Sequence, residues 1–375
     1  MNKLKLGWNK DFKKLALSTL CMSVCFAIHS AIFNNFIVYE LGIQPQQFGT
    51  VESLRETPGF LTAAFAGLAM RMSTPKLAGA YLIIMGIGMG SYALARGIFS
   101  LIASSIFWSL GFHSWMPLRE TMALNLSDEQ KGRRLGELRS ADSVGALIGF
   151  GTVYLFVKML TFRITYMMAG AVVLLGGLVS FFIIDIAPTI RLPRFTLKKQ
   201  YGVYYTLMFL QGCRRQIFMT FAIFALVREY NTSAQSIAAL MFINTVANFL
   251  LAPTAGKIVD KIGERKSLSI SFIGLALIFW GYASFKSRYV LYALYCIDNL
   301  VFLLGIAMTT YLNKIAKSED IRATLSMGIT MDHIAAVIMP IVGGLLWETY
   351  SYRLIFQIGS VIALISLAIS QKVTN

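Results

Sequence analysis

The sequence predicts an all-α membrane protein with twelve spanning helices, and three observations support that prediction. Hydrophobic residues make up 56% of the 375 residues and charged residues only 14%, whereas a soluble chain carries roughly 25% charged residues. The mean hydropathy is +0.64. Apolar runs recur along the chain, and each has about the 20 residues that a helix needs to cross the hydrocarbon core of a bilayer.

The predicted spans follow one another with short polar breaks. The first six lie at 14–40, 45–70, 77–95, 101–126, 136–160 and 164–186, and the second six at 201–227, 234–256, 267–285, 288–312, 322–346 and 352–371. The lysines before the first run are typical of a signal peptide, but that run is too long for one. We expect an N-terminal six-helix bundle at 1–187, a basic cytoplasmic central loop at 188–200 and a C-terminal six-helix bundle at 201–375.

Lysine and arginine indicate the topology, because short basic loops stay on the cytoplasmic side. With the N-terminus in the cytoplasm, the cytoplasmic loops and tails hold 23 of the 34 basic residues, the opposite side holds seven and the spans hold four. We therefore expect a multi-pass protein of the cell (inner) membrane with both termini cytoplasmic. The net charge of +16 does not favour a nucleic-acid partner, because the basic residues do not gather on one face.

The two halves of the chain repeat each other. The loop after the second span, 67–76, corresponds to the loop after the eighth, 256–266, and Asp142 in the fifth span corresponds to Asp332 in the eleventh. Six spans followed by six similar spans in the same orientation are typical of a parallel repeat about an axis normal to the membrane.

These features resemble the major facilitator superfamily. Its signature loop, G-x-L-a-D-R-x-G-R-[KR], is matched in the second half by Gly256, Asp260, Lys261, Gly263, Arg265 and Lys266. In the first half, Arg71 stands where the signature has its acidic residue. The resemblance implies two helix bundles that rock about a central site, and a conformational gate at 256–266. In that gate Asp260 would face a helix N-terminus, where the helix dipole favours negative charge.

Ionisable groups inside hydrocarbon are costly unless they face protein or a watery cavity, so they indicate which helices line a path. The third, sixth, ninth and twelfth spans have almost none. The candidate cavity residues are His29, Asn34, Glu52, Arg55, Glu56, His113, Gln211, Arg214, Arg215, Asp298, Asn299, Asp332 and His333.

Glu52, Arg55 and Glu56 are spaced three and four residues apart and therefore share a helix face. One carboxylate is neutralised by the arginine, and the other is a candidate proton carrier. Asp332 is a further proton-coupling candidate. A fixed salt-bridge cluster that holds the bundle together remains the alternative interpretation. Pro58 follows directly and is expected to kink the span.

Arg214 and Arg215 lie about 100° apart around their helix. We expect one to pair with Asp298 or Asp332 and the other to be free for a ligand, since guanidinium suits carboxylate or phosphate. The mid-span charges nearly balance, so the preference for an anionic substrate is modest.

All three histidines, His29, His113 and His333, lie in spans. Histidine titrates near neutral pH and binds metals, but hydrogen-bonded structural histidines are the more common case. We expect no metal site and no cofactor. Phosphate-loop and dinucleotide motifs are absent from the sequence.

The leading hypothesis is a monomeric secondary transporter, not an enzyme. It would move a small organic solute, anionic or amphipathic, across the lipid bilayer by proton-coupled alternating access. The alternatives are a membrane-embedded transferase, for which His113 with Arg119 and Glu120 is the candidate site, and a non-transporting sensor of the same fold.

Overall fold

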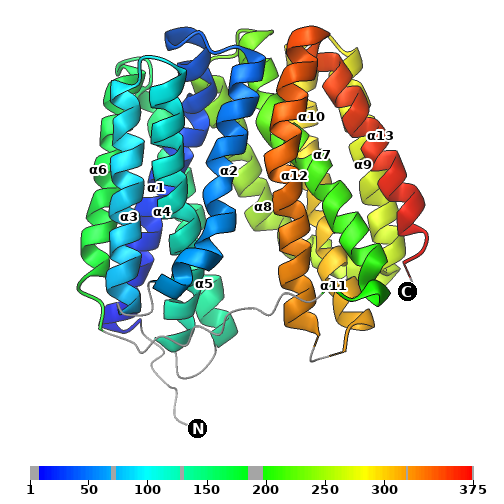
Figure 1. Ribbon diagram of the computed structural model, residues 1–375, viewed down its shortest axis with the longest axis horizontal. Helices are drawn as coiled ribbons and strands as arrows, with labels where there is room; N and C mark the ends of the chain where they lie inside the picture. The colour runs from blue at the N-terminus through cyan, green and yellow to red at the C-terminus, as the bar shows by residue number, and fades with distance from the viewer. Residues whose placement is uncertain (1–7, 69–72, 127–130, 185–196, 318–319, 374–375) are drawn as a thin grey trace. The chain divides into compact units, whose positions relative to one another are not determined.

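The computed structural model describes residues 8–68, 73–126, 131–184, 197–317 and 320–373. Every regular element among these residues is helical (Figure 1). Much of the predicted central loop, 188–200, and the Arg71 part of the first signature loop lie outside the described residues.

The helices follow the predicted spans closely. The first half contains α1 (Lys10–Asn35), η1 (Phe36–Glu40), α2 (Pro45–Leu68), α3 (Thr74–Ser91), η3 (Tyr92–Leu94), α4 (Ile98–Asn125), α5 (Lys131–Phe156) and α6 (Phe162–Ser180). The second half contains η4 (Lys199–Tyr201), α7 (Gly202–Arg228), α8 (Ala234–Ile262), α9 (Glu264–Ser284), α10 (Arg288–Phe302), η5 (Leu303–Gly305), α11 (Ile306–Ile315), α12 (Ile321–Thr349) and α13 (Tyr352–Ser370). The tenth predicted span corresponds to α10, η5 and α11 together.

Among the described residues, nine helices are long and apolar enough to cross a membrane. The remaining long helices, α2, α5 and α7, are the ones with several charged residues along their length, which lowers their hydropathy. Large apolar side chains are exposed on the outside of the helices, for example Ile87 at 56%, Met167 at 61% and Leu277 at 62%. Such a surface is suited to lipid and not to water.

Contacts divide the chain into two compact units. Unit 1 combines 1–33 with 58–191, and unit 2 combines 34–57 with 192–375. In unit 1, α3 packs against α4 and α6. A Cβ added to Gly86 of α3 would lie 3.0 Å from the backbone oxygen of Gly170 in α6, so these helices touch backbone to backbone. Small residues permit such close approach between membrane helices.

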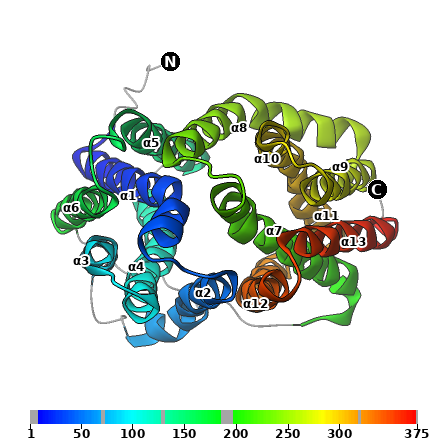
Figure 2. The same cartoon turned by 90° about the horizontal axis from the view of Figure 1, so that it is seen from above.

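In unit 2, α7 packs against α12 and α13, and α9 packs against α10 and α13 (Figure 2). The short segment 34–57, which contains η1 and the first half of α2, also belongs to this unit. Its boundaries fall inside helical stretches and not in loops. The contact-based units therefore differ from the six-and-six division of the chain in where this segment is assigned.

Candidate functional site

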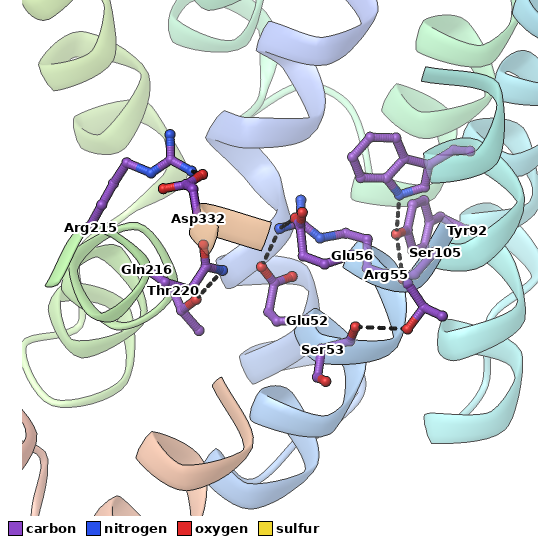
Figure 3. Close-up of polar contacts among 12 residues, drawn as sticks. Glu52, Ser53, Arg55, Glu56, Tyr92, Ser105, Arg215, Gln216, Thr220 and Asp332 are labelled. Atoms are coloured by element: carbon purple, nitrogen blue, oxygen red, sulfur yellow. Dashed lines mark hydrogen bonds and ion pairs between the residues drawn. The ribbon is translucent and has the colours of Figure 1, made fainter. Parts of the chain in front are cut away.

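The acidic residues of α2 hold Arg55 between them. A guanidinium nitrogen of Arg55 lies 2.7 Å from a carboxylate oxygen of Glu52 and 2.9 Å from one of Glu56 (Figure 3). Glu52 is only 6% exposed. Its second oxygen, Oε1, has no hydrogen-bond partner among the described residues. The three side chains share one helix face, as the spacing predicts, and Arg55 bonds to both glutamates.

A second pair lies opposite this cluster within unit 2. Arg215 of α7 donates a hydrogen bond to Asp332 of α12. In Figure 3, Asp332 lies on the side of Arg215 that faces Glu56 and Arg55. Glu56 interacts electrostatically with Asp332. The guanidinium side chain of Arg215 is 36% exposed, so it remains accessible although it is paired.

Arg214 has different surroundings from its neighbour. It is 1% exposed, and its guanidinium donates a 3.2 Å hydrogen bond to Asp298 of α10. The rings of Phe279 and Phe302 lie 5.6 and 5.3 Å from its guanidinium carbon. Cation–π contacts of this kind stabilise a desolvated cation. The expectation that one of the two arginines is unpaired was wrong, because each has an aspartate partner.

The remaining polar candidates in unit 2 have amide side chains. Asn299 and Asn248 exchange two hydrogen bonds, of 2.8 and 3.1 Å, between α10 and α8. Gln211 lies beside Gly305, which interrupts the tenth span. Asn34 is buried at the end of α1. Asn248 is one of the two asparagines that the eighth span offers, and its bonds to Asn299 place it with these candidates.

The unit 1 candidates form a separate group. His29 is 3% exposed and is surrounded by the rings of Phe33, Tyr92, Trp108 and Tyr166. Its Nδ1 lies 3.4 Å from the hydroxyl of Tyr166. This environment supports the structural interpretation of His29. His113 of α4 contacts the ring of Phe112.

Sequence reasoning did not place Arg119 and Asp142 in the candidate site. Arg119 of α4 is 5% exposed and forms an ion pair with Asp142 of α5. Asp142 also accepts a 2.6 Å hydrogen bond from Ser23 of α1. The repeat pattern pointed to Asp142, but only the fold shows that an arginine from another helix neutralises it. Arg119 also lies 3.9 Å from a carboxylate oxygen of Glu120, its neighbour in the group considered for a transferase.

The predicted gate at 256–266 joins α8 to α9. Gly263 has a φ of 83° and a ψ of 164°, a conformation that is essentially restricted to glycine. Beside it, buried Glu264 forms a 2.7 Å ion pair with Lys314, and Arg265 donates to Gln371 at 3.2 Å. Asp260 is exposed. Gly256, Lys261 and Lys266 lie on the same α8–α9 corner, and Glu264 is the member that sequence reasoning missed.

The mid-membrane charges of unit 2 do not balance. Glu52, Glu56, Asp298 and Asp332 are four acids, and Arg55, Arg214 and Arg215 are three bases, which leaves a net charge of −1 when all are ionised. Arg214 and Arg215 each pair with one aspartate, and Arg55 pairs with both Glu52 and Glu56. Groups of at least three histidine, cysteine or acidic residues that could hold a metal ion are not found in the described part of the chain.

The sequence model of the Major Facilitator Superfamily matches residues 15–201 and 204–372. The chain belongs to the major facilitator superfamily. It is 23% identical over 356 residues to Multidrug resistance protein 2 of Bacillus subtilis, covering 84% of this chain and 88% of that protein. An uncharacterized MFS-type transporter of Methanocaldococcus jannaschii is 35% identical over 115 residues, which are 30% of this chain and 28% of that protein.

Solved structures of other transporters share the fold. The nucleoside transporter NupG superposes with a TM-score of 0.81 at 15% identity, covering 96% of this chain and 99% of that one. A POT family transporter in complex with 5-aminolevulinic acid gives a TM-score of 0.77 at 15% identity, with 100% and 98% covered. At this identity the likeness concerns the fold alone. It agrees with the family match, which covers most of the chain.

Proposed function

We propose that this superfamily member is a proton-coupled secondary transporter of a small organic solute, not an enzyme. It would work by alternating access, as a monomer in the cell (inner) membrane with both termini in the cytoplasm. Its functional halves would be 1–187 and 201–375. The observation that carries the proposal is the burial of Glu52 in α2, where its side chain is 6% exposed, since a carboxylate buried in the membrane favours taking up a proton.

Arg215 is the proposed contact for an anionic group on the solute. It is the more exposed of the two arginines of α7, and guanidinium binds carboxylate or phosphate through two parallel hydrogen bonds. Its present partner, Asp332, would compete with the solute. When Asp332 takes up a proton it ceases to compete, so proton uptake and solute binding would assist each other.

Transport in liposomes tests the proposal. Purified protein is first screened for solutes that raise its melting temperature at several pH values, and the hits are then followed as radiolabelled solutes across vesicles with an imposed pH gradient. We expect accumulation that a protonophore abolishes. Transport of every hit at the same rate with and without the protonophore would contradict proton coupling.

Two variants assign the roles. Arg215→Ala should lose transport of anionic hits and keep its melting temperature, whereas Arg353→Ala, which changes an arginine outside the proposed site, should transport normally. Glu52→Gln combined with Glu56→Gln should still exchange solute across the membrane but should no longer respond to the pH gradient. Unchanged transport by Arg215→Ala would remove this residue from the site.

A further inference from the structure

The start of α9 and the end of α13 bring basic side chains together at one corner of unit 2. The two helices pack against each other, and Figure 2 shows them side by side near the C-terminus. Arg265 and Lys266 lie in the first turn of α9, and Lys372 lies in the turn that follows α13. All three are exposed. Together with Gln371 they are called the basic corner.

Hydrogen bonds hold the two helix ends of the basic corner together. The Nε of Arg265 donates to the side-chain oxygen of Gln371 at 3.2 Å. The amide nitrogen of Gln371 donates to the hydroxyl of Ser269 at 3.0 Å. Farther along the same pair of helices, the hydroxyl of Ser360 donates to the backbone oxygen of Ala276 at 2.9 Å. Gln371 therefore orients the guanidinium of Arg265 with respect to both helices.

The charge around the basic corner is positive. The segments 257–266 and 371–372 contain five basic residues and two acidic residues. One of the acids, Glu264, is 4% exposed and forms a 2.7 Å ion pair with Lys314 of α11. The other, Asp260, is exposed at the end of α8. The corner therefore presents an excess of cationic groups that an anion would complement.

An apolar surface begins directly beside these charges. Ile270, Ile273 and Leu277 of α9 are all exposed. Together with Lys266 they are spaced four, three and four residues apart, so the four side chains share one helix face. Leu364 of α13 is exposed as well. This apolar strip on α9 continues from the basic corner into the span, where it faces hydrocarbon.

A phospholipid has the same two parts in the same order. Guanidinium binds a phosphate through two parallel hydrogen bonds, and a lysine ammonium binds it as a point charge. Acyl chains cover an exposed apolar strip without leaving the bilayer. Basic residues at the membrane surface attract anionic lipids, and each contributes about fivefold to binding. A soluble phosphate would use the basic corner alone and leave the apolar strip without a role.

We propose that the basic corner and the apolar strip of α9 form a binding site for an anionic glycerophospholipid. Its phosphate lies on Arg265, Lys266 and Lys372, and its acyl chains lie along α9. The lipid thereby bridges the ends of α9 and α13 and stabilises their contact. The inference goes beyond the proposed transport, because it needs neither a solute nor a proton gradient. With the proposed topology the lipid belongs to the cytoplasmic leaflet.

Lipid binding to the purified protein tests the site. Protein stripped of lipid in detergent is titrated with phosphatidylglycerol or with phosphatidylcholine of the same acyl chains, and bound lipid is counted by native mass spectrometry. Both lipids have the phosphate, but phosphatidylcholine also has a cationic group that the basic corner repels. We expect the first phosphatidylglycerol to bind roughly tenfold more tightly. Equal affinity for the two lipids would overturn the proposal.

A triple variant removes the basic corner. Arg265→Gln combined with Lys266→Gln and Lys372→Gln should bind the two lipids equally. Phosphatidylglycerol should raise the melting temperature of the wild type, because a ligand that binds only the folded state stabilises it. The triple variant should lose this rise. A triple variant that keeps the tenfold preference would overturn the site.

A matched triple variant in unit 1 separates this site from general positive charge. Lys10→Gln combined with Lys13→Gln and Lys131→Gln removes the same charge from exposed positions. It should keep the full preference for phosphatidylglycerol. An equal loss in the two triple variants would show that the lipid responds to net charge, and the basic corner would not be a site.

Gln371→Ala tests the corner without changing its charge. It removes the hydrogen bonds to Arg265 and Ser269, and the loss of one such bond weakens binding by about fivefold. We expect that weakening for phosphatidylglycerol, with a melting temperature in detergent alone equal to that of the wild type. Full affinity in Gln371→Ala would show that the arrangement of the corner is not used, which would contradict a specific site.

Competition with soluble anions distinguishes a lipid from a free phosphate. Inorganic phosphate or glycerol 3-phosphate is added in large excess over bound phosphatidylglycerol. Neither should displace it, because neither covers the apolar strip of α9. Displacement by either would assign the basic corner to a soluble anion and overturn the lipid site. All these measurements are made without solute or gradient, so their failure would leave the proposed transport untouched.

Discussion

Arg214 and Arg215 are adjacent in sequence, yet the fold gives their guanidinium groups different surroundings. Arg214 is enclosed by Asp298 and two phenylalanine rings, whereas Arg215 keeps 36% of its side chain exposed beside Asp332. The arginine doublet could be recognised in the sequence, because charge in a span is rare. Which residue is buried depends on how α7 is rotated against α10 and α12, and local spacing carries no information about that rotation.

Replacing Arg214 by alanine should destabilise the protein. The change leaves Asp298 buried and unpaired, and breaking a buried pair in this way costs about 3–5 kcal/mol. Denaturant unfolding in detergent would measure the loss. Adding Asp298→Ala should recover part of it, because no lone charge then remains. Equal stability of Arg214→Ala and Arg215→Ala would contradict this difference in burial.

Asp320, between α11 and α12, makes the stability of the protein depend on pH in the acid range. Lys198 and Tyr201 donate hydrogen bonds to its carboxylate at 2.6 and 2.8 Å, and the bond from Lys198 is the main cause that lowers the pKa of Asp320 below its ordinary value. A carboxyl with a lowered pKa in the fold stabilises the protein fully above its unfolded pKa of about 3.9. That contribution is lost as the pH falls through the lower folded value.

Asp320→Asn should therefore have a lower melting temperature than the wild type at neutral pH. When the pH is lowered below about 4, its melting temperature should fall less than that of the wild type. Glu229→Gln, which changes an exposed acid on the α7–α8 loop, is the matched control and should follow the wild type. Parallel melting curves for Asp320→Asn and wild type down to the lowest pH would show that the contact with Lys198 contributes nothing.

Elements were easier to predict than contacts. The apolar runs placed the spans closely, because a helix in lipid must satisfy its backbone internally and cannot be short. The cluster of Glu52, Arg55 and Glu56 was predictable for the same reason, since helical spacing is local. The interruption Leu303–Gly305 in the tenth span and the assignment of 34–57 to unit 2 were not, because both arise from packing against other helices.

The corner between α8 and α9 depends on Gly263. Its φ and ψ are accessible essentially only to glycine, and forcing another residue into this region costs about 1–3 kcal/mol. Gly263→Ala should therefore lower the melting temperature. Gly256→Ala lies in the same signature loop but inside α8 with open space around its Cβ position. It should be neutral or stabilising by about 0.5–1 kcal/mol. A melting temperature that falls equally in both variants would contradict the role of the corner.

At the scale of the whole molecule, the repeat preserves the acids but not their partners. Asp142 and Asp332 correspond in the two halves, but Asp142 pairs with Arg119 of α4 and Asp332 with Arg215 of α7. The halves are therefore alike in fold and unlike in charge. Composition and basic-residue counts were sufficient to predict the fold class. The electrostatic asymmetry between the halves could be seen only once partners distant in sequence were known.

The distribution of basic residues predicts which side of the membrane each loop occupies. Single cysteines at the exposed positions Lys158 and Lys286 should react with a membrane-impermeant maleimide in intact cells, because their loops lie on the side that holds seven of the 34 basic residues. Cysteines at exposed Lys257 and Lys372 should react only after permeabilisation, since basic loops stay in the cytoplasm. Labelling at Lys257 in intact cells would reverse the topology.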